Sequence, residues 1–122
     1  MMPPRDLLDL RRVWRAAGYS LNGLKTALKY ETPFRQEMAI FVVLAPLGLW
    51  LGRNGVERSL LVGSLMLVLI AELLNSAIEA TVDRVSLEIH PLARRAKDLG
   101  SAAVMLSIVT AASVWLFVLL DR

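Results

Sequence analysis

The sequence predicts an all-α membrane protein with three transmembrane helices preceded by an amphipathic surface helix. The chain has 122 residues, enough for a single domain spanning 1–122, and 56% of them are hydrophobic. Its mean hydropathy of +0.53 is well above that of a soluble domain of this size. Three apolar stretches, separated by charged or turn-forming segments, are long enough to cross a bilayer once their flanks are included.

The first transmembrane helix is expected at about residues 33–52. Its uncharged core, residues 38–52, has 15 residues, which make about 22 Å of helix against a hydrocarbon core of ~30 Å. The helix must therefore continue back through the segment "FRQE" to span the membrane. Pro46 is expected to kink this helix or to loosen one of its turns.

The second and third transmembrane helices are expected at about 58–83 and 91–120. The turn between the first two holds an Asn-Gly pair, which is a turn signal. Pro91 suits the first turn of the third helix, because its missing N–H is not needed there. The 22 uncharged residues of 99–120 form the clearest transmembrane stretch in the chain.

Residues 5–29 are expected to form the amphipathic helix on the membrane surface. Apolar residues recur on one face at helical spacing: Leu7, Leu10, Val13, Trp14 and Ala17. Basic residues occupy the other face: Arg11, Arg12 and Arg15. Two glycines, Gly18 and Gly23, are expected to break or bend the helix.

The charges predict a membrane partner and an orientation. The formal charge of +3 is carried by an apolar chain, which favours membrane lipids over nucleic acid as a partner. Eleven of the 14 Lys and Arg residues precede the first span or lie between the second and third. The N-terminus is therefore expected in the cytoplasm and the C-terminus outside. The absence of cysteine excludes disulfides and thiolate metal sites.

A polar stripe marks the end of the second apolar stretch, in "ELLNSAIEATVDR". At 100° per residue, Glu72, Asn75, Glu79 and Asp83 fall within about 100° of one another. A carboxylate near hydrocarbon costs roughly 2.5 kcal/mol or more, so something must offset that cost. Polar residues of the other two spans are expected at the same depth; they are Glu31, Arg35, Lys97 and Asp98.

Clustered carboxylates without thiols or a histidine cluster suit a hard cation such as Mg²⁺. A lysine beside them can hold a phosphate, and a further carboxylate can act as a general base. Together these groups indicate phosphoryl transfer. Three alternatives remain open on the residues alone: a structural polar seam within a helical bundle, an ion- or proton-conducting oligomer, and a non-catalytic membrane assembly protein. The lone loop residue His90 is typical of a solvated histidine, and Trp14, Tyr19, Trp50 and Trp115 are typical of interface aromatics.

The segment "ELLNSAIEATVDR", followed by "ARRAKDLGSAAV", resembles the prokaryotic integral-membrane diacylglycerol kinases. "RAAGYSLNGLKTAL" and "FRQE" are similar to the same family's earlier motifs, and the resemblance covers residues 10–118. It implies a homotrimer in the bacterial cytoplasmic membrane, with sites shared between subunits. It also implies transfer of the γ-phosphate of Mg-ATP to diacylglycerol, giving phosphatidic acid. Related members phosphorylate undecaprenol, which is the alternative substrate.

The resemblance also implies roles for individual residues. Glu72 matches the general base, Glu31 and Glu79 match the metal ligands, and Lys97 matches the lysine on the ATP phosphates. The remaining matches are polar residues that bind or support the nucleotide, Asn75, Asp98, Arg12 and Tyr19, and weaker candidates, Glu37, Asp83, His90 and Arg35. The chain departs from the family pattern at Ile89, where some relatives have an aromatic residue, and at Pro33.

Overall fold

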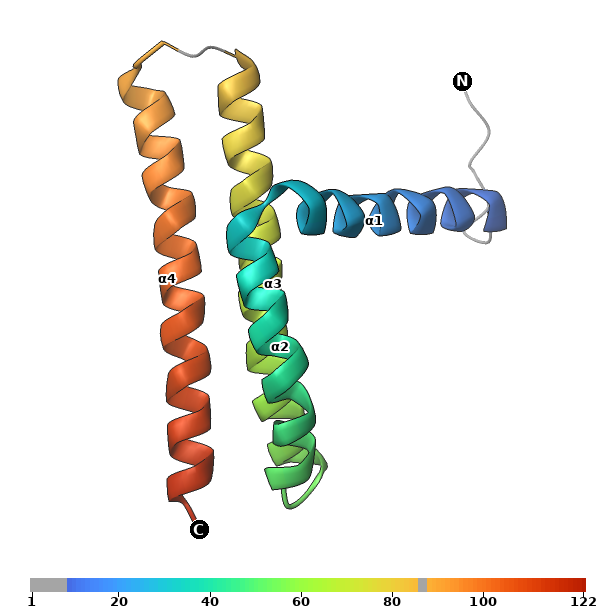
Figure 1. Cartoon of the computed structure of the whole chain (residues 1–122), viewed down its shortest axis with the longest axis vertical. Coiled ribbons are helices and arrows are strands. Elements are labelled where there is room, and N and C mark those ends of the chain that lie inside the picture. Colours follow the sequence, from blue (N-terminus) through green and yellow to red (C-terminus); the bar gives the residue numbers. More distant parts are fainter. Residues whose placement is uncertain (1–8, 86–87) are drawn as a thin grey trace.

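The computed structural model describes residues 9–85 and 88–122, and all the regular structure in this part of the chain is helical. The helices are α1 (Leu10–Tyr30), α2 (Thr32–Leu51), α3 (Gly55–Val85) and α4 (Pro91–Leu120). Helices α2, α3 and α4 run antiparallel as a bundle, and α1 extends across its axis (Figure 1). Helix α3 packs against both α2 and α4. The all-helical class predicted from the sequence is confirmed.

Three of these helices, α2, α3 and α4, are long and apolar enough to cross a membrane. Helix α2 has 20 residues, about 30 Å, which matches the hydrocarbon thickness. It begins at Thr32, so the predicted extension through "FRQE" is confirmed, and Pro33 occupies its first turn. The helix also continues through Pro46 to Leu51. Helices α3 and α4, at 31 and 30 residues, are about 45 Å long and extend beyond a bilayer core.

Helix α1 is continuous, which corrects the expectation that Gly18 and Gly23 interrupt it. An interior glycine costs about 1 kcal/mol relative to alanine, which two positions in a 21-residue helix can absorb. The side chain of Asp9 caps the helix by accepting a hydrogen bond from the Arg11 N–H (3.2 Å). The predicted start at residue 5 lies outside the described residues.

The corner between α1 and α2 is held by Arg35 and by a buried aromatic ring. Arg35 donates hydrogen bonds to the carbonyls of Leu28 (3.3 Å) and Lys29 (2.8 Å), the last turn of α1. Phe34 is fully buried and belongs to the hydrophobic core cluster, with Ala27 and Leu69 packed around it. These contacts set the direction in which α1 leaves the bundle. Arg35, which was a weak site candidate from the sequence, therefore forms hydrogen bonds that stabilise this corner.

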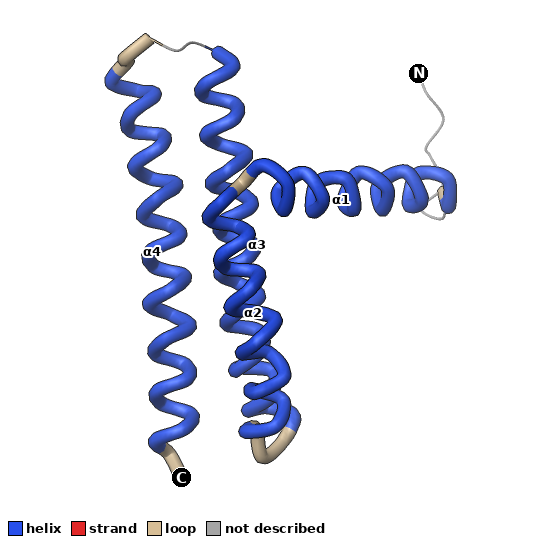
Figure 2. The backbone as a smooth tube through the Cα atoms, viewed as in Figure 1, coloured by secondary structure: helices blue, strands red, loops and turns tan. Residues whose placement is uncertain are grey.

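The turn between α2 and α3 caps the start of α3 (Figure 2 shows the turn in tan). The Asn54 Oδ1 accepts from the Glu57 N–H (2.9 Å), and the Glu57 carboxylate accepts from the Arg53 N–H (3.1 Å). Because the Asn54 side chain satisfies one of the first free N–H groups of the helix, α3 begins at Gly55, three residues before the start at 58 that was predicted from the sequence.

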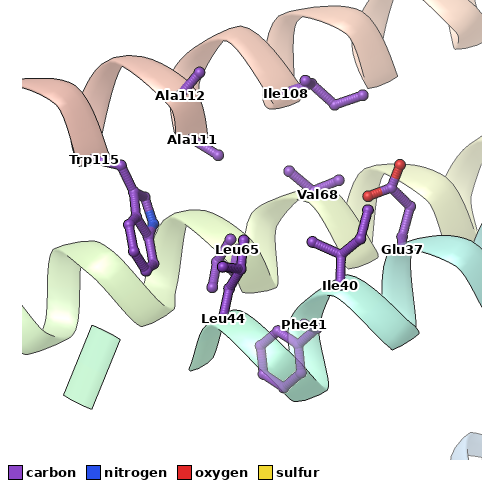
Figure 3. A pocket seen from close by; sticks show the side chains of 10 residues that line it. All are labelled: Glu37, Ile40, Phe41, Leu44, Leu65, Val68, Ile108, Ala111, Ala112 and Trp115. Carbon is purple, nitrogen blue, oxygen red and sulfur yellow. The ribbon is translucent and has the colours of Figure 1, made fainter. Parts of the chain in front are cut away.

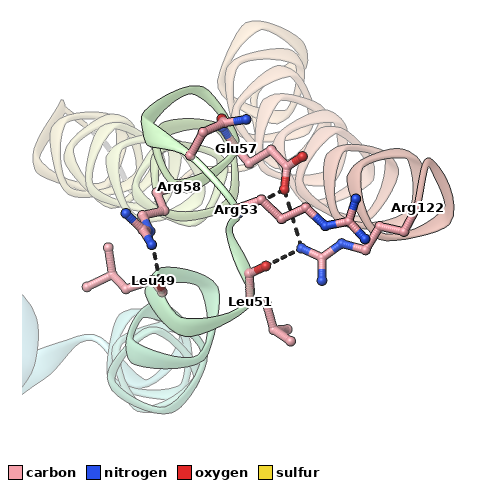
Figure 4. A network of polar contacts seen from close by, with 7 residues as sticks. Leu49, Leu51, Arg53, Glu57, Arg58 and Arg122 are labelled. Atoms are coloured by element: carbon pink, nitrogen blue, oxygen red, sulfur yellow. Dashed lines mark hydrogen bonds and ion pairs between the residues drawn. The ribbon is translucent and has the colours of Figure 1, made fainter.

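A polar network ties α4 to this turn at the far end of the bundle (Figure 4). The Arg122 guanidinium donates to the Leu51 carbonyl and forms an ion pair with Glu57 (3.3 Å). Arg58 donates to the Leu49 carbonyl (3.1 Å). These charged groups satisfy backbone carbonyls at the end of α2 that have no partner within the helix.

Trp115, which was predicted from the sequence to be an aromatic residue at the membrane–water interface, packs between helices. Its indole N–H donates to the Leu61 carbonyl (3.0 Å), which links α4 to α3. Its ring also lies over Gly48 of α2, where an added Cβ would stand 3.3 Å from the ring. Gly48 therefore provides the close approach that lets one indole touch all three bundle helices.

Candidate active site

The polar stripe of α3 contains two buried oxygen atoms without a protein partner. Glu72 is only 5% exposed, and among the described residues its Oε2 has no hydrogen-bond partner. The same is true of the Oδ1 of Asn75, one helical turn further along. A buried, unsatisfied polar atom is costly and in native proteins calls for a ligand, a water or a functional role.

Carboxylates on three elements place negative charge near Glu72. The charges of Glu37 on α2, Glu79 on α3 and Glu31 at the α1–α2 corner all act on it electrostatically. Asn75 donates from its Nδ2 to the Glu79 Oε1 (3.4 Å), so these two residues form one unit. The convergence of α2 and α3 at this depth thus gathers several negative charges beside a buried acid.

Lys97 of α4 forms an ion pair with Asp83 of α3, with 2.7 Å between Nζ and Oδ1. Glu79 is a second carboxylate whose charge acts on this lysine. Both members of the ion pair are about half exposed, and such pairs contribute only about 0–1 kcal/mol. An incoming phosphate can therefore compete with Asp83 for Lys97 at little cost.

A hollow of about 400 Å³ lies beside this ion pair, between the ends of α3 and α4. Asp98 and Lys97 line it from α4, together with Ile89 and His90 from the preceding loop. Ile89 is almost fully exposed there. His90 caps α4, because its Nδ1 accepts from the Leu92 N–H (3.0 Å). This capping role was missed from the sequence, and the signal for it was the proline immediately after the histidine.

Residues of α1 lie apart from this hollow in a single chain. Arg12 and Tyr19 are exposed on α1, which leaves the bundle on the side away from α4 (Figure 1). Glu31, at the base of α1, lines a different groove, between α1 and the Ser76 side of α3. The structure thus brings Glu72, Asn75 and Glu79 together with neighbouring carboxylates, and it does not bring the α1 residues to Lys97.

The oxygen ligands near Glu72 are of the chemical type that Mg²⁺ prefers, although a single chain brings few of them together. Within residues 9–85 and 88–122, no three Asp, Glu or His side chains are grouped so that they could hold a metal ion. Mg²⁺ commonly takes one or two carboxylates and completes its octahedron with substrate phosphates and water. The Glu79 carboxylate, the unpartnered oxygens of Glu72 and Asn75, and the nearby Glu31 are all hard oxygen donors of this kind.

An apolar groove of about 370 Å³ opens between α2, α3 and α4 (Figure 3), and it was not predicted from the sequence. Glu37 stands at one end of the groove and Trp115 at the other. Aliphatic side chains such as Leu65, Val68 and Ile108 line the length between them. The groove therefore combines a long apolar wall with one carboxylate, a lining suited to an amphiphilic molecule.

A bundle of three membrane-length helices with one buried carboxylate, Glu72, and further polar side chains near the same end is the architecture of a multi-pass membrane protein with a polar site. The chain belongs to the prokaryotic diacylglycerol kinase family, whose model matches residues 18–119.

Curated relatives agree over nearly the whole chain. A diacylglycerol kinase of Pseudomonas aeruginosa is 49% identical over 118 residues, covering 97% of this chain and 96% of the relative. One of Escherichia coli K12 is 47% identical over 108 residues, covering 88% of each. A third, of Helicobacter pylori 26695, is 35% identical over 114 residues, with 93% and 88% covered. The resemblance noted in the sequence is confirmed.

Proposed function

We propose that this protein is a lipid kinase that transfers the γ-phosphate of Mg-ATP to the primary hydroxyl of diacylglycerol, giving phosphatidic acid. The observation that carries this proposal is the family match over residues 18–119, joined by curated diacylglycerol kinases at 47–49% identity. The buried Glu72, the carboxylates whose charges act on it and the apolar groove give that activity a physical setting.

Glu72 acts on the lipid in this proposal. Its unpartnered Oε2 accepts a hydrogen bond from the primary hydroxyl and takes the proton as the oxygen attacks the γ-phosphorus. The bond from the γ-phosphorus to the bridging oxygen breaks in the same transfer, and ADP leaves. Its depth in the bundle supports the role, because a lipid alcohol can present its hydroxyl at that level while its chains stay in hydrocarbon. Glu37 lies at the adjoining end of the apolar groove and supports the polar headgroup there.

Glu79 and Glu31 hold the metal, and Lys97 holds the nucleotide phosphates after leaving Asp83. Mg²⁺, when bound there, would neutralise the negative charge of the phosphates during the transfer. Asn75 orients the Glu79 carboxylate through its side-chain amide. Asp98 supports the nucleotide from the hollow beside Lys97, where His90 and Ile89 form the rim.

The working form is a homotrimer with sites shared between subunits. One observation supports this: Arg12 and Tyr19, proposed to contact the nucleotide, lie away from Lys97 within one chain. A neighbouring subunit brings the α1 residues to the nucleotide. Native mass spectrometry from detergent is expected to give a mass of three 13.5 kDa chains.

The chain spans the bacterial cytoplasmic membrane with its N-terminus inside and its C-terminus outside. Its bias of Lys and Arg toward the end of the bundle that carries α1 supports this orientation. Helix α1 then lies on the cytoplasmic leaflet, where its exposed Leu10, Val13 and Trp14 enter the lipid and its arginines meet anionic headgroups.

The test is a radiolabelled-ATP assay on the purified protein with Mg²⁺, in mixed micelles that contain diacylglycerol, undecaprenol or neither. We expect label in phosphatidic acid, formed faster than undecaprenyl phosphate. Faster labelling of undecaprenol would assign the chain to the alternative lipid substrate. No labelled lipid in either arm would refute the kinase proposal and favour an assembly role.

A further inference from the structure

Gly100 of α4 lies directly against the side chain of Asn75 on α3. A Cβ built on Gly100 would overlap the Asn75 Oδ1 and would stand 3.2 Å from its Cγ. The nearest other side-chain atom, the Ile78 Cδ1, would be at an ordinary contact distance of 3.7 Å. In a close-packed interface, an alanine at this position must therefore turn the Asn75 amide or push the two helices apart.

Glycine is needed at position 100 because it leaves space for a neighbouring side chain, and not because of its backbone freedom. It lies inside α4, and no glycine in the described part of the chain has a positive φ. Glycine in a helix interior lowers helix stability relative to alanine, so it needs a reason in packing. Gly63, inside α3, has nothing within 4 Å of a built Cβ and offers a matched comparison.

The amide held in this space has two ends with different surroundings. Its Nδ2 donates to the Glu79 Oε1, and its buried Oδ1 faces Gly100 without a hydrogen-bond partner. Because the amide group is planar, turning Oδ1 away from a new Cβ also turns Nδ2 away from Glu79. The orientation of the Glu79 carboxylate thus depends on the absence of a side chain at position 100.

We propose that Gly100 is a positioning residue of the metal-nucleotide site: by lacking a Cβ it sets the Asn75 amide and, through that amide, the direction of the Glu79 carboxylate. The inference rests on the proposed function in so far as Glu79 binds Mg²⁺. It adds a residue on α4 that touches neither lipid nor nucleotide and acts through its neighbour on α3.

The first test is spectroscopic and needs no substrate. The chain has three asparagines, Asn22, Asn54 and Asn75, so labelling their side-chain amides with ¹⁵N gives three NH₂ groups, each a pair of signals at one nitrogen shift. Gly100→Ala is expected to shift the Asn75 signal and leave those of Asn22 and Asn54 in place. Gly63→Ala is expected to shift none of them. An unmoved Asn75 signal in Gly100→Ala would overturn the proposal.

The second test is kinetic. Gly100→Ala is expected to lower kcat at least tenfold and to raise the half-saturating Mg²⁺ concentration, with Gly63→Ala within about twofold of the wild type. Wild-type protein without lipid kinase activity would refute the proposed function itself. Active wild-type protein with equal rates in Gly100→Ala and Gly63→Ala would refute the positioning role alone.

A third measurement remains informative if Gly100→Ala does not fold. Thermal unfolding is followed for Gly100→Ala, Asn75→Ala and the double variant. Because Asn75→Ala removes the overlapping atoms, adding Gly100→Ala to it is expected to leave the melting temperature unchanged or raise it. A double variant that does not fold, or that loses as much stability relative to Asn75→Ala as Gly100→Ala loses relative to the wild type, would show that the Cβ meets something other than Asn75 and would refute the proposal.

Discussion

The Lys97 Nζ lies 2.7 Å from the Asp83 Oδ1, across the interface between α4 and α3. The pair stands at the rim of the hollow proposed for the nucleotide, and Glu79 also acts on the lysine. The structure thus pairs Lys97, the cation proposed to bind the nucleotide phosphates, with a half-exposed carboxylate. This arrangement suits a site that opens when an anionic substrate arrives.

Asp83→Asn is expected to lower the apparent KM for ATP, because Lys97 no longer has to leave a carboxylate. An exposed ion pair is worth about 0–1 kcal/mol, so the decrease is expected to be about fivefold or less. Initial rates at varied ATP concentration measure it, with Asp121→Asn at the opposite end of α4 as the control. An increased KM would show that Asp83 helps to bind the nucleotide.

Removing Mg²⁺ with a chelator is expected to abolish lipid phosphorylation and leave the helical fold intact. The bundle is held by apolar packing, and in the described residues no group of three acidic or histidine ligands supports a structural metal. Far-UV circular dichroism and turnover are measured on the same sample, and added Mg²⁺ is expected to restore the rate. Loss of helical signal on chelation would contradict this account.

Arg122→Gln is expected to lower the free energy of unfolding by about 1–2 kcal/mol, because Arg122 both hydrogen-bonds the Leu51 carbonyl and pairs with Glu57. Thermal unfolding in detergent measures the loss. Arg53→Gln serves as the control, since at Arg53 it is the backbone N–H that bonds to Glu57. Equal melting temperatures for the two variants would mean that the Arg122 contacts add no stability.

Trp115→Phe is expected to cost about 2 kcal/mol of stability, since it removes both the hydrogen bond to the Leu61 carbonyl and the indole Cζ2 and Cη2 atoms that contact Gly48. Trp50→Phe, at a largely exposed position, is expected to have no measurable effect. Chemical or thermal unfolding compares the two variants. A larger loss of stability in Trp50→Phe than in Trp115→Phe would contradict the role given to Trp115.

The helices were predictable from the sequence because hydropathy and length decide which segments suit a membrane. Fine detail at their ends was less predictable. The early start of α3 depends on the Asn54 side chain, which caps the Glu57 N–H. The unbroken course of α1 depends on the small cost of Gly18 and Gly23. Such local effects are too small to stand out in an apolar pattern.

The polar stripe was predictable from helical periodicity, but its partners were not. Spacing placed Glu72, Asn75 and Glu79 on one face of a helix. It could not show that Lys97 would pair with Asp83 or that Gly100 would receive the Asn75 side chain. Contacts between helices depend on their relative rotation and distance, which one-dimensional periodicity does not contain.

The most direct test of the central claim compares phosphatidic acid formation by the wild-type protein and by Glu72→Gln and Glu79→Gln, at saturating Mg-ATP and diacylglycerol. We expect both variants to fold and the rate to fall by about 10²–10⁴-fold in Glu72→Gln, the range for loss of a general base. We expect a similarly large loss in Glu79→Gln. Folded variants that turn over at the wild-type rate would contradict the placement of the reaction at this carboxylate cluster.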